Sequence, residues 1–241
     1  MNGFLSVLKA ETRKLRKRKK YFIFLLIAMG LGVLTGILNT LPALSSEPAI
    51  NLFSAAGYID HMFSIYLPLI VFMAANDLIA SEIKEKTIIS SLVSPVSRTC
   101  IYTAKCFSIL LFTVVQALII AAGNVVLYFI TDGGISLLPF AYVLFDAIPL
   151  FTLIVFACLI SLLTHSPAFS MLLLIVSYIL LKVLGSFFGI SPMLFTSYIP
   201  WHSMLHGGLN AFDLLLRIAA VAAPAILFLS AGALTLEGKR F

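Results

Sequence analysis

Six apolar runs, separated by short polar breaks, constrain the fold of this chain more than any other feature. A run of about 20 apolar residues is long enough, as a helix, to cross the hydrocarbon core of a bilayer. The composition agrees, because 61% of the 241 residues are hydrophobic and 11% are charged. We therefore predict an all-α membrane protein with six transmembrane helices, in residues 21–41, 58–80, 106–130, 140–163, 168–189 and 214–236.

The break between the fourth and fifth runs is short and reads Thr-His-Ser-Pro, residues 164–167. Proline lacks the backbone N–H that continues a helix, and its ring clashes with the preceding turn. A tight turn between two helices is therefore expected here rather than one very long helix.

The basic residues predict the orientation. Eight of the 16 Lys and Arg residues lie between Lys9 and Lys20, directly before the first apolar run. An even number of spans puts both termini on one side, and the positive-inside rule makes that side cytoplasmic. The same clustering argues against a nucleic-acid partner, since no aromatic side chains alternate with the basic ones.

Residues 1–20 form an element of their own. Phe4, Leu8 and Leu15 recur at helical spacing, and basic residues occupy the rest of the surface. We expect an amphipathic helix that lies flat at the interface, with its basic side toward membrane lipid. The alternative is a disordered basic tail that only sets the topology.

Residues 190–213, before the last run, are too apolar for a free loop. Tyr198 and Trp201 are typical of the membrane–water boundary. Prolines and glycines divide the segment into short pieces, so we expect an outer re-entrant segment buried against protein.

Motifs of catalysis are missing from the sequence. There is no Walker A loop, and the neighbouring pairs His165-Ser166 and His202-Ser203 would point apart on a helix. The three cysteines have no metal-ligand spacing. We predict no catalytic residues, cofactor or metal, and read each histidine as a polar boundary residue.

Two charges fall inside predicted spans. Asp146 and Lys182 lie about 10 Å from the same end of consecutive antiparallel helices, at 1.5 Å per residue. They could form an ion pair, which would lower the cost of placing either in lipid. Alternatively Lys182 extends to the interface and Asp146 faces a wet cleft. An ATP-independent carrier or channel that uses both charges is the alternative function.

A polar segment, residues 81–105, separates the second and third runs. It mixes charged residues with aliphatic ones such as Ile88 and Leu92, and Pro95 disfavours helical geometry at the residue before it. This mixture exceeds what a solvated turn requires. It indicates a docking surface for a soluble partner.

The stretch "NDLIASEIKEKTIISSLVSPVSRTCIYTAK" resembles the loop after the second span of ABC type-2 permeases, the membrane subunits of ATP-driven exporters. The matching pieces are Glu82 near the helix exit, Thr87 about one turn later, the run from Pro95 to Arg98, and Lys105. Such permeases usually have glycine before the threonine, whereas this chain has Lys86. Together with the topology, the resemblance covers residues 1–241 as a single transmembrane domain.

The resemblance implies a role for each part. The cytoplasmic coupling loop, 81–105, would contact a separate ATP-binding subunit, and a second identical or related permease chain would complete the pathway. The small size resembles permeases of bacterial antimicrobial-peptide export, such as lantibiotic or bacitracin immunity, in the cytoplasmic membrane. The implied ATPase contacts are Glu82, Glu85, Lys86, Thr87, Pro95 and Arg98.

Overall fold

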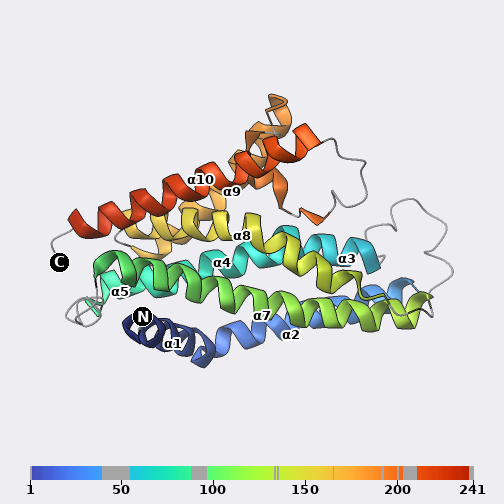
Figure 1. The fold of residues 1–241 in the computed structure, drawn as a ribbon. Coiled ribbons are helices and arrows are strands. Elements are labelled where there is room, and N and C mark those ends of the chain that lie inside the picture. The colour runs from blue at the N-terminus through green and yellow to red at the C-terminus, as the bar shows by residue number, and fades with distance from the viewer. Residues whose placement is uncertain are drawn as a thin grey trace.

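The computed structural model describes residues 2–39, 55–87, 97–132, 134, 136–164, 166–190, 193–199, 201–202 and 211–238. All regular structure in these residues is helical, and the long helices run side by side (Figure 1). The elements are α1 (Asn2–Lys17), α2 (Lys19–Asn39), α3 (Ala55–His61), η2 (Met62–Tyr66), α4 (Leu67–Ala75), η3 (Asn76–Ala80), α5 (Ser81–Lys84), α7 (Arg98–Asp132), α8 (Leu138–Leu163), α9 (Pro167–Phe187), η5 (Phe195–Tyr198) and α10 (Ala211–Gly238).

Five helices in the described residues are long and apolar enough to cross a membrane, with mean hydropathies of 1.7 to 2.5. This confirms a multi-pass, all-helical membrane protein. The first apolar run lies on α2, which is not among the five, so the count of six spans stays a prediction. The five candidate spans are Gly57–Lys84, Arg98–Ile130, Leu138–Leu163, Pro167–Phe187 and Leu215–Gly238.

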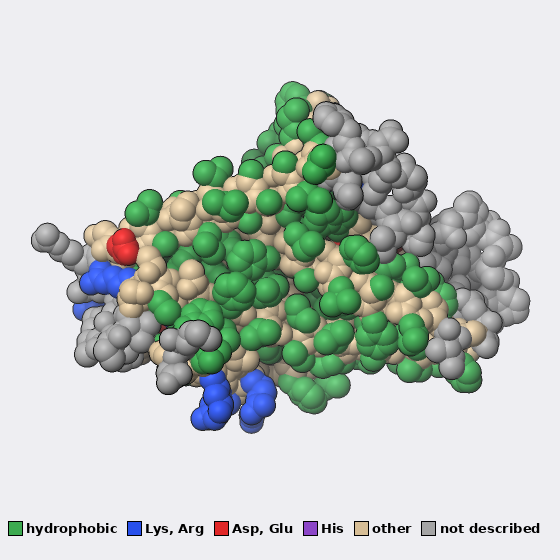
Figure 2. Space-filling view, in the orientation of Figure 1, with side chains coloured by type: hydrophobic (Ala, Val, Ile, Leu, Met, Phe, Trp, Pro, Cys, Tyr) green, Lys and Arg blue, Asp and Glu red, His purple; other side chains and the backbone are tan. Residues whose placement is uncertain are grey.

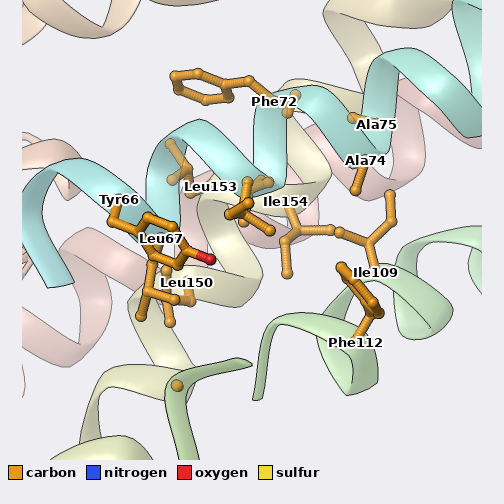
Figure 3. Packing of buried hydrophobic residues seen from close by; sticks show 14 of the residues in the cluster. Tyr66, Leu67, Phe72, Ala74, Ala75, Ile109, Phe112, Leu150, Leu153 and Ile154 are labelled. Carbon is orange, nitrogen blue, oxygen red and sulfur yellow. The ribbon is translucent and has the colours of Figure 1, made fainter. Parts of the chain in front are cut away.

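The span Gly57–Lys84 lies at the centre of the bundle. Its most apolar window is 72% buried, against 17% for Leu215–Gly238. Figure 3 shows how α4 packs against α7 and α8 through aromatic and aliphatic side chains. The outer helices instead present apolar side chains outward, and Figure 2 shows this apolar surface along the bundle. Such a surface suits contact with lipid.

Pro68, near the start of α4, leaves a gap in the backbone hydrogen bonds of this central span. It has no N–H to donate to the carbonyl of Ser64, four residues earlier. The hydroxyl of Tyr178 in α9 donates to that carbonyl instead, at 3.1 Å. A neighbouring helix thereby satisfies the backbone group that proline frees, as membrane interiors require.

The turn between α8 and α9 is confirmed. Helix α8 ends at Leu163, and Thr164 is extended, with φ −93° and ψ 142°. Helix α9 then begins at Pro167, in the first turn, where a missing N–H costs nothing.

Helix α1 forms as its spacing predicts, so residues 2–17 are not a disordered tail. Its apolar side contacts protein: the rings of Phe4 and Phe107 meet edge to face at 6.2 Å. The Ser108 hydroxyl donates to the carbonyl of Leu8 at 3.2 Å. The partner of this apolar face is therefore α7, while its placement at the interface stays a prediction.

Both ends of the predicted loop 81–105 are helical in the structure. Helical geometry continues to Lys84 in α5, and α7 already begins at Arg98. The physical reason is that polar residues at these helix ends, Glu82 and Lys105, pair with each other. Their burial allows both helices to extend beyond their apolar parts.

Candidate functional site

Lys105 lies at the centre of a buried group of charges where α1, α5 and α7 meet. Its side chain is 2% exposed. The ammonium donates to Glu82 Oε2 at 2.7 Å and to the carbonyl of Leu78 at 3.0 Å, and it lies 3.2 Å from Glu11 Oε1. A buried cation is tolerated because two carboxylates and a carbonyl surround it.

Lys14 is the solvent-exposed member of this group and pairs with both of its carboxylates. Its ammonium lies 2.7 Å from Glu82 Oε1 and 3.0 Å from Glu11 Oε1. Partial burial lowers the pKa of Lys14, but the hydrogen bond to Glu82 and the charges of Glu11 and Glu82 outweigh it, and the pKa lies above its usual value. The group thus pairs two basic side chains with two acidic ones.

A second group is centred on Asp77, in the π-helical segment η3. Lys20 donates to Asp77 Oδ1 at 2.7 Å, and the Tyr21 hydroxyl donates to Oδ2 at 2.6 Å. Arg18 Nη1 lies 3.2 Å from Oδ1. Because these partners come from the junction of α1 and α2, Asp77 fixes that junction to the central span.

The two groups together form what we call the α1 network. It holds α1, the end of the central span and the start of α7 together, so that a displacement of one is resisted by the others. Its members are Glu11, Lys14, Arg18, Lys20, Tyr21, Asp77, Glu82 and Lys105.

The residues expected to contact an ATPase fall into different settings. Glu82 is 7% exposed and belongs to the α1 network, so a direct contact with another protein would require that network to open. Glu85, Lys86 and Thr87 follow it as an exposed turn. Pro95 lies outside the described residues.

Arg98, the last of these residues with a described position, begins α7. Its Nη1 donates to the backbone carbonyls of Leu236 at 3.4 Å and Glu237 at 3.2 Å. These carbonyls belong to the last turn of α10, so the end of α10 lies beside the start of α7 and at the same end of the bundle as α1 (Figure 1).

Lys86 adopts a left-handed backbone, with φ 56°. Side chains with a Cβ disfavour this region, and glycine enters it without that cost. The glycine that related permeases carry here thus has a structural reason, and this chain keeps the turn in spite of its lysine.

A third group of charges lies at the other end of the central span and is centred on His202. Its Nδ1 lies 2.6 Å from Asp146 Oδ2, and its Nε2 lies 2.7 Å from Asp60 Oδ1. The backbone N–H groups of Trp201 and His202 donate to Asp146 Oδ1 at 2.6 and 2.9 Å. Tyr142 stacks on the imidazole with ring centroids 4.3 Å apart. We call Asp60, Asp146 and His202 the His202 cluster.

The charge of His202 follows from these contacts. Burial lowers its pKa, but the hydrogen bonds to Asp146 and Asp60 and the charges of both carboxylates raise it to about 9. The imidazole is therefore protonated at neutral pH, and both ring nitrogens donate. The cluster fastens residues 201–202 to α3 and α8.

Asp146 and Lys182 are not brought together as an ion pair. Asp146 binds His202, while the ammonium of Lys182 donates to the carbonyl of Ile199 at 3.2 Å and lies over the ring of Tyr178. The pair does not form in the structure because Ile199 supplies a partner for Lys182, and Trp201 and His202 supply partners for Asp146. Both charges hold this segment in place.

Sequence reasoning missed Glu11, Asp60, Asp77 and His202. Glu11 had a visible signal, since a carboxylate interrupts the apolar face of α1. His202 had none, because its two partners come from helices distant in sequence. Among the described residues, no group of three or more His, Cys, Asp or Glu side chains has a metal-binding arrangement.

The long apolar helices and the charges buried between them define a multi-pass membrane protein with internally paired polar groups. Residues 7–176 match the family described as ABC-2 family transporter protein, and the chain belongs to this family. It is thus an ABC-2 permease component of the membrane, a kind of subunit that is typically non-catalytic and generally pairs with ATP-binding subunits. No curated protein matches the chain.

Proposed function

We propose that this chain is the membrane-spanning subunit of an ATP-driven exporter and works with a separate cytoplasmic ATP-binding subunit. The observation that carries the proposal is the position of the exposed turn at Glu85, Lys86 and Thr87. It begins three residues after Glu82, which is tied by ion pairs to α1 and α7. A force applied at the turn would therefore reach three helices at once.

The coupling loop in this proposal is residues 81–105, in the cytoplasm, with both termini on the same side. The proposed contacts with the ATPase are Glu85, Lys86, Thr87, Pro95 and Arg98. Glu82 is buried, and its ion pairs fix the start of the loop to α1 and α7. Residues 1–20 lie at the cytoplasmic interface. Helix α2 adds a span to the five candidates and is the first of the six in chain order. Residues 190–213 form the outer re-entrant segment. Closure of the ATPases would shift the helices between inward-open and outward-open states.

The complete transporter contains a second permease chain, identical or related, because one bundle of this size does not enclose a pathway alone. The proposed substrate is an antimicrobial peptide or another amphipathic compound, exported from a bacterial cell. This follows from the resemblance to lantibiotic and bacitracin immunity permeases and from the apolar character of the spans. Among the described residues, Asp146 and Lys182 each have a local structural partner, which weighs against an ATP-independent carrier that uses both charges.

Copurification and ATP hydrolysis test this function. The tagged full chain, extracted from its host in detergent, should retain an ATP-binding cassette protein with ATPase activity. Glu85→Lys should reduce the amount retained without changing membrane insertion. The control is Asp132→Lys, which makes the same charge reversal at the last residue of α7, far from the turn at Glu85. Equal retention by both variants, or no ATPase with the wild type, would contradict the proposal.

A further inference from the structure

Basic residues in α1 and just after it differ in their surroundings, and two sets of three can be compared. Lys14, together with Arg18 and Lys20 just beyond the helix end, makes ion pairs with acidic residues of the central span. In the part of the chain that the structure describes, Lys9, Arg13 and Arg16 have no acidic partner. The second set therefore has three positive charges that no acidic side chain among the described residues neutralises.

These three cations surround one hollow. Lys9, Thr12, Arg13 and Arg16 line a space of about 240 Å³ on one face of α1. Their spacing of three and four residues places them one above another along the helix. Long basic side chains generally keep their aliphatic stems along the protein and turn their charged ends toward water. The hydroxyl of Thr12 is held by the carbonyl of Leu8 at 2.8 Å.

We propose that this hollow binds the phosphate of an anionic phospholipid headgroup. Guanidinium groups match phosphate oxygens with two parallel hydrogen bonds, and a lysine adds a further charge. Three unpaired cations around one hollow thus fit a group with several anionic oxygens better than they fit a single carboxylate.

The position of α1 favours a lipid as the source of that phosphate. Its apolar face is already occupied by α7, as the contact between Phe4 and Phe107 shows. One residue beyond its end the chain enters α2, where Phe22 and Ile23 are 63% and 55% exposed. The hollow is therefore close in the chain to apolar side chains that require a hydrocarbon environment, at the depth where headgroups lie. Figure 2 shows basic side chains projecting from this end of the apolar surface.

A lipid bound here would also act on the α1 network. Glu11 and Lys14 lie on the same helix, between the residues that line the hollow, and Lys14 pairs with both Glu11 and Glu82. Fixing the outer face of α1 to the bilayer surface therefore stabilises the contacts on its inner face. This inference does not depend on the ATP-binding subunit, because it concerns the permease chain alone.

The test measures lipid binding to the purified full chain in detergent by native mass spectrometry, with phosphatidylglycerol, phosphatidylcholine and inorganic phosphate as separate probes. We expect preferential binding of phosphatidylglycerol. The triple variant Lys9→Gln, Arg13→Gln, Arg16→Gln should bind it about a hundredfold more weakly, because all three basic residues that attract the anionic headgroup are removed. The variant Arg13→Lys, Arg16→Lys keeps the charge but loses the paired N–H donors, so its affinity should lie between those of the wild type and the triple variant. This graded loss guards against misfolding of the triple variant.

The matched control is Lys17→Gln, Lys19→Gln, Lys84→Gln, which removes three exposed charges outside the hollow. It should leave phosphatidylglycerol binding unchanged. Equal losses in both triple variants would show a general charge effect and overturn the site. So would saturation by inorganic phosphate alone, or loss of a copurifying ATPase with lipid affinity intact, which would assign the hollow to a free anion or to a protein partner.

Discussion

The Nζ atom of Lys105 lies 2.7 Å from Oε2 of Glu82, and the two side chains are 2% and 10% exposed. Glu82 precedes the exposed turn at residues 85–87 in the chain, and Lys105 follows it. The pair thus joins the end of the central span to the start of α7. Breaking a buried pair on one side leaves an uncompensated charge, which costs about 3–5 kcal/mol. The pair is therefore a structural requirement of the region that we propose couples to ATP.

Lys105→Met should destabilise the chain by about 3 kcal/mol, because Glu11 and Glu82 would then share only Lys14. The double variant Glu11→Gln, Lys105→Met removes one charge of each sign and should recover part of the loss. Thermal unfolding in detergent measures both, and Lys84→Met, at an exposed position, is the control. Additive losses in the double variant would contradict a shared network.

The His202 cluster predicts a dependence of stability on pH. The pKa of His202 is raised from 6.5 to about 9, so its charged form stabilises the folded chain. This contribution is fully present below pH 6.5 and is lost as the pH rises through 9, with a magnitude of up to about 3 kcal/mol. The groups facing the imidazole are Asp60, Asp146, Phe63 and Tyr142.

Melting temperatures at pH 6 and pH 9.5 test this effect. The wild type should lose stability across the interval more than His202→Gln does, since glutamine does not titrate. His61→Gln, next to Asp60 in α3, should lose as much stability across this interval as the wild type does. A pH profile shared by all three proteins would rule out His202 as the titrating group.

Lys86→Gly should stabilise the chain by about 1 kcal/mol, because glycine adopts the left-handed backbone without the cost that a Cβ imposes. Lys86→Ala removes the same charge but keeps the Cβ, and should give no such gain. Lys84→Gly, at the last residue of α5, removes the same charge from a helical position and should give no gain. Chemical denaturation of the purified chain would measure all three, and a gain for the alanine variant would point to charge rather than backbone.

Tyr178→Phe removes the donor to the Ser64 carbonyl and should destabilise the chain by about 1 kcal/mol. Adding Pro68→Ala supplies a backbone N–H to the freed carbonyl and should recover the loss. Thermal unfolding of the two single variants and the double variant forms a double-mutant cycle. If Pro68→Ala gave the same change with Tyr178 and with Phe at this position, the compensation would be refuted.

The helices were predictable because a membrane demands long apolar runs, and Pro167 marked the turn between two of them. The family followed from residues 76–105, whose order of acidic, Thr, Pro and basic residues is local in the sequence. The pairing of Asp146 was not predictable, because its partner His202 is 56 residues away and lies in a segment without regular spacing. Glu82 likewise looked exposed, since only folding brings Lys14 and Lys105 to it.

The α1 network also has a consequence for biosynthesis. Glu11 leaves the ribosome first, Glu82 follows, and Lys105 is made last, yet its ammonium lies against both carboxylates. An unfinished chain that ends before Arg98 would therefore hold two neighbouring carboxylates with only Lys14 between them. Helix α1 is synthesised first, but it makes its final contacts only after the third apolar run, on α7, has been synthesised.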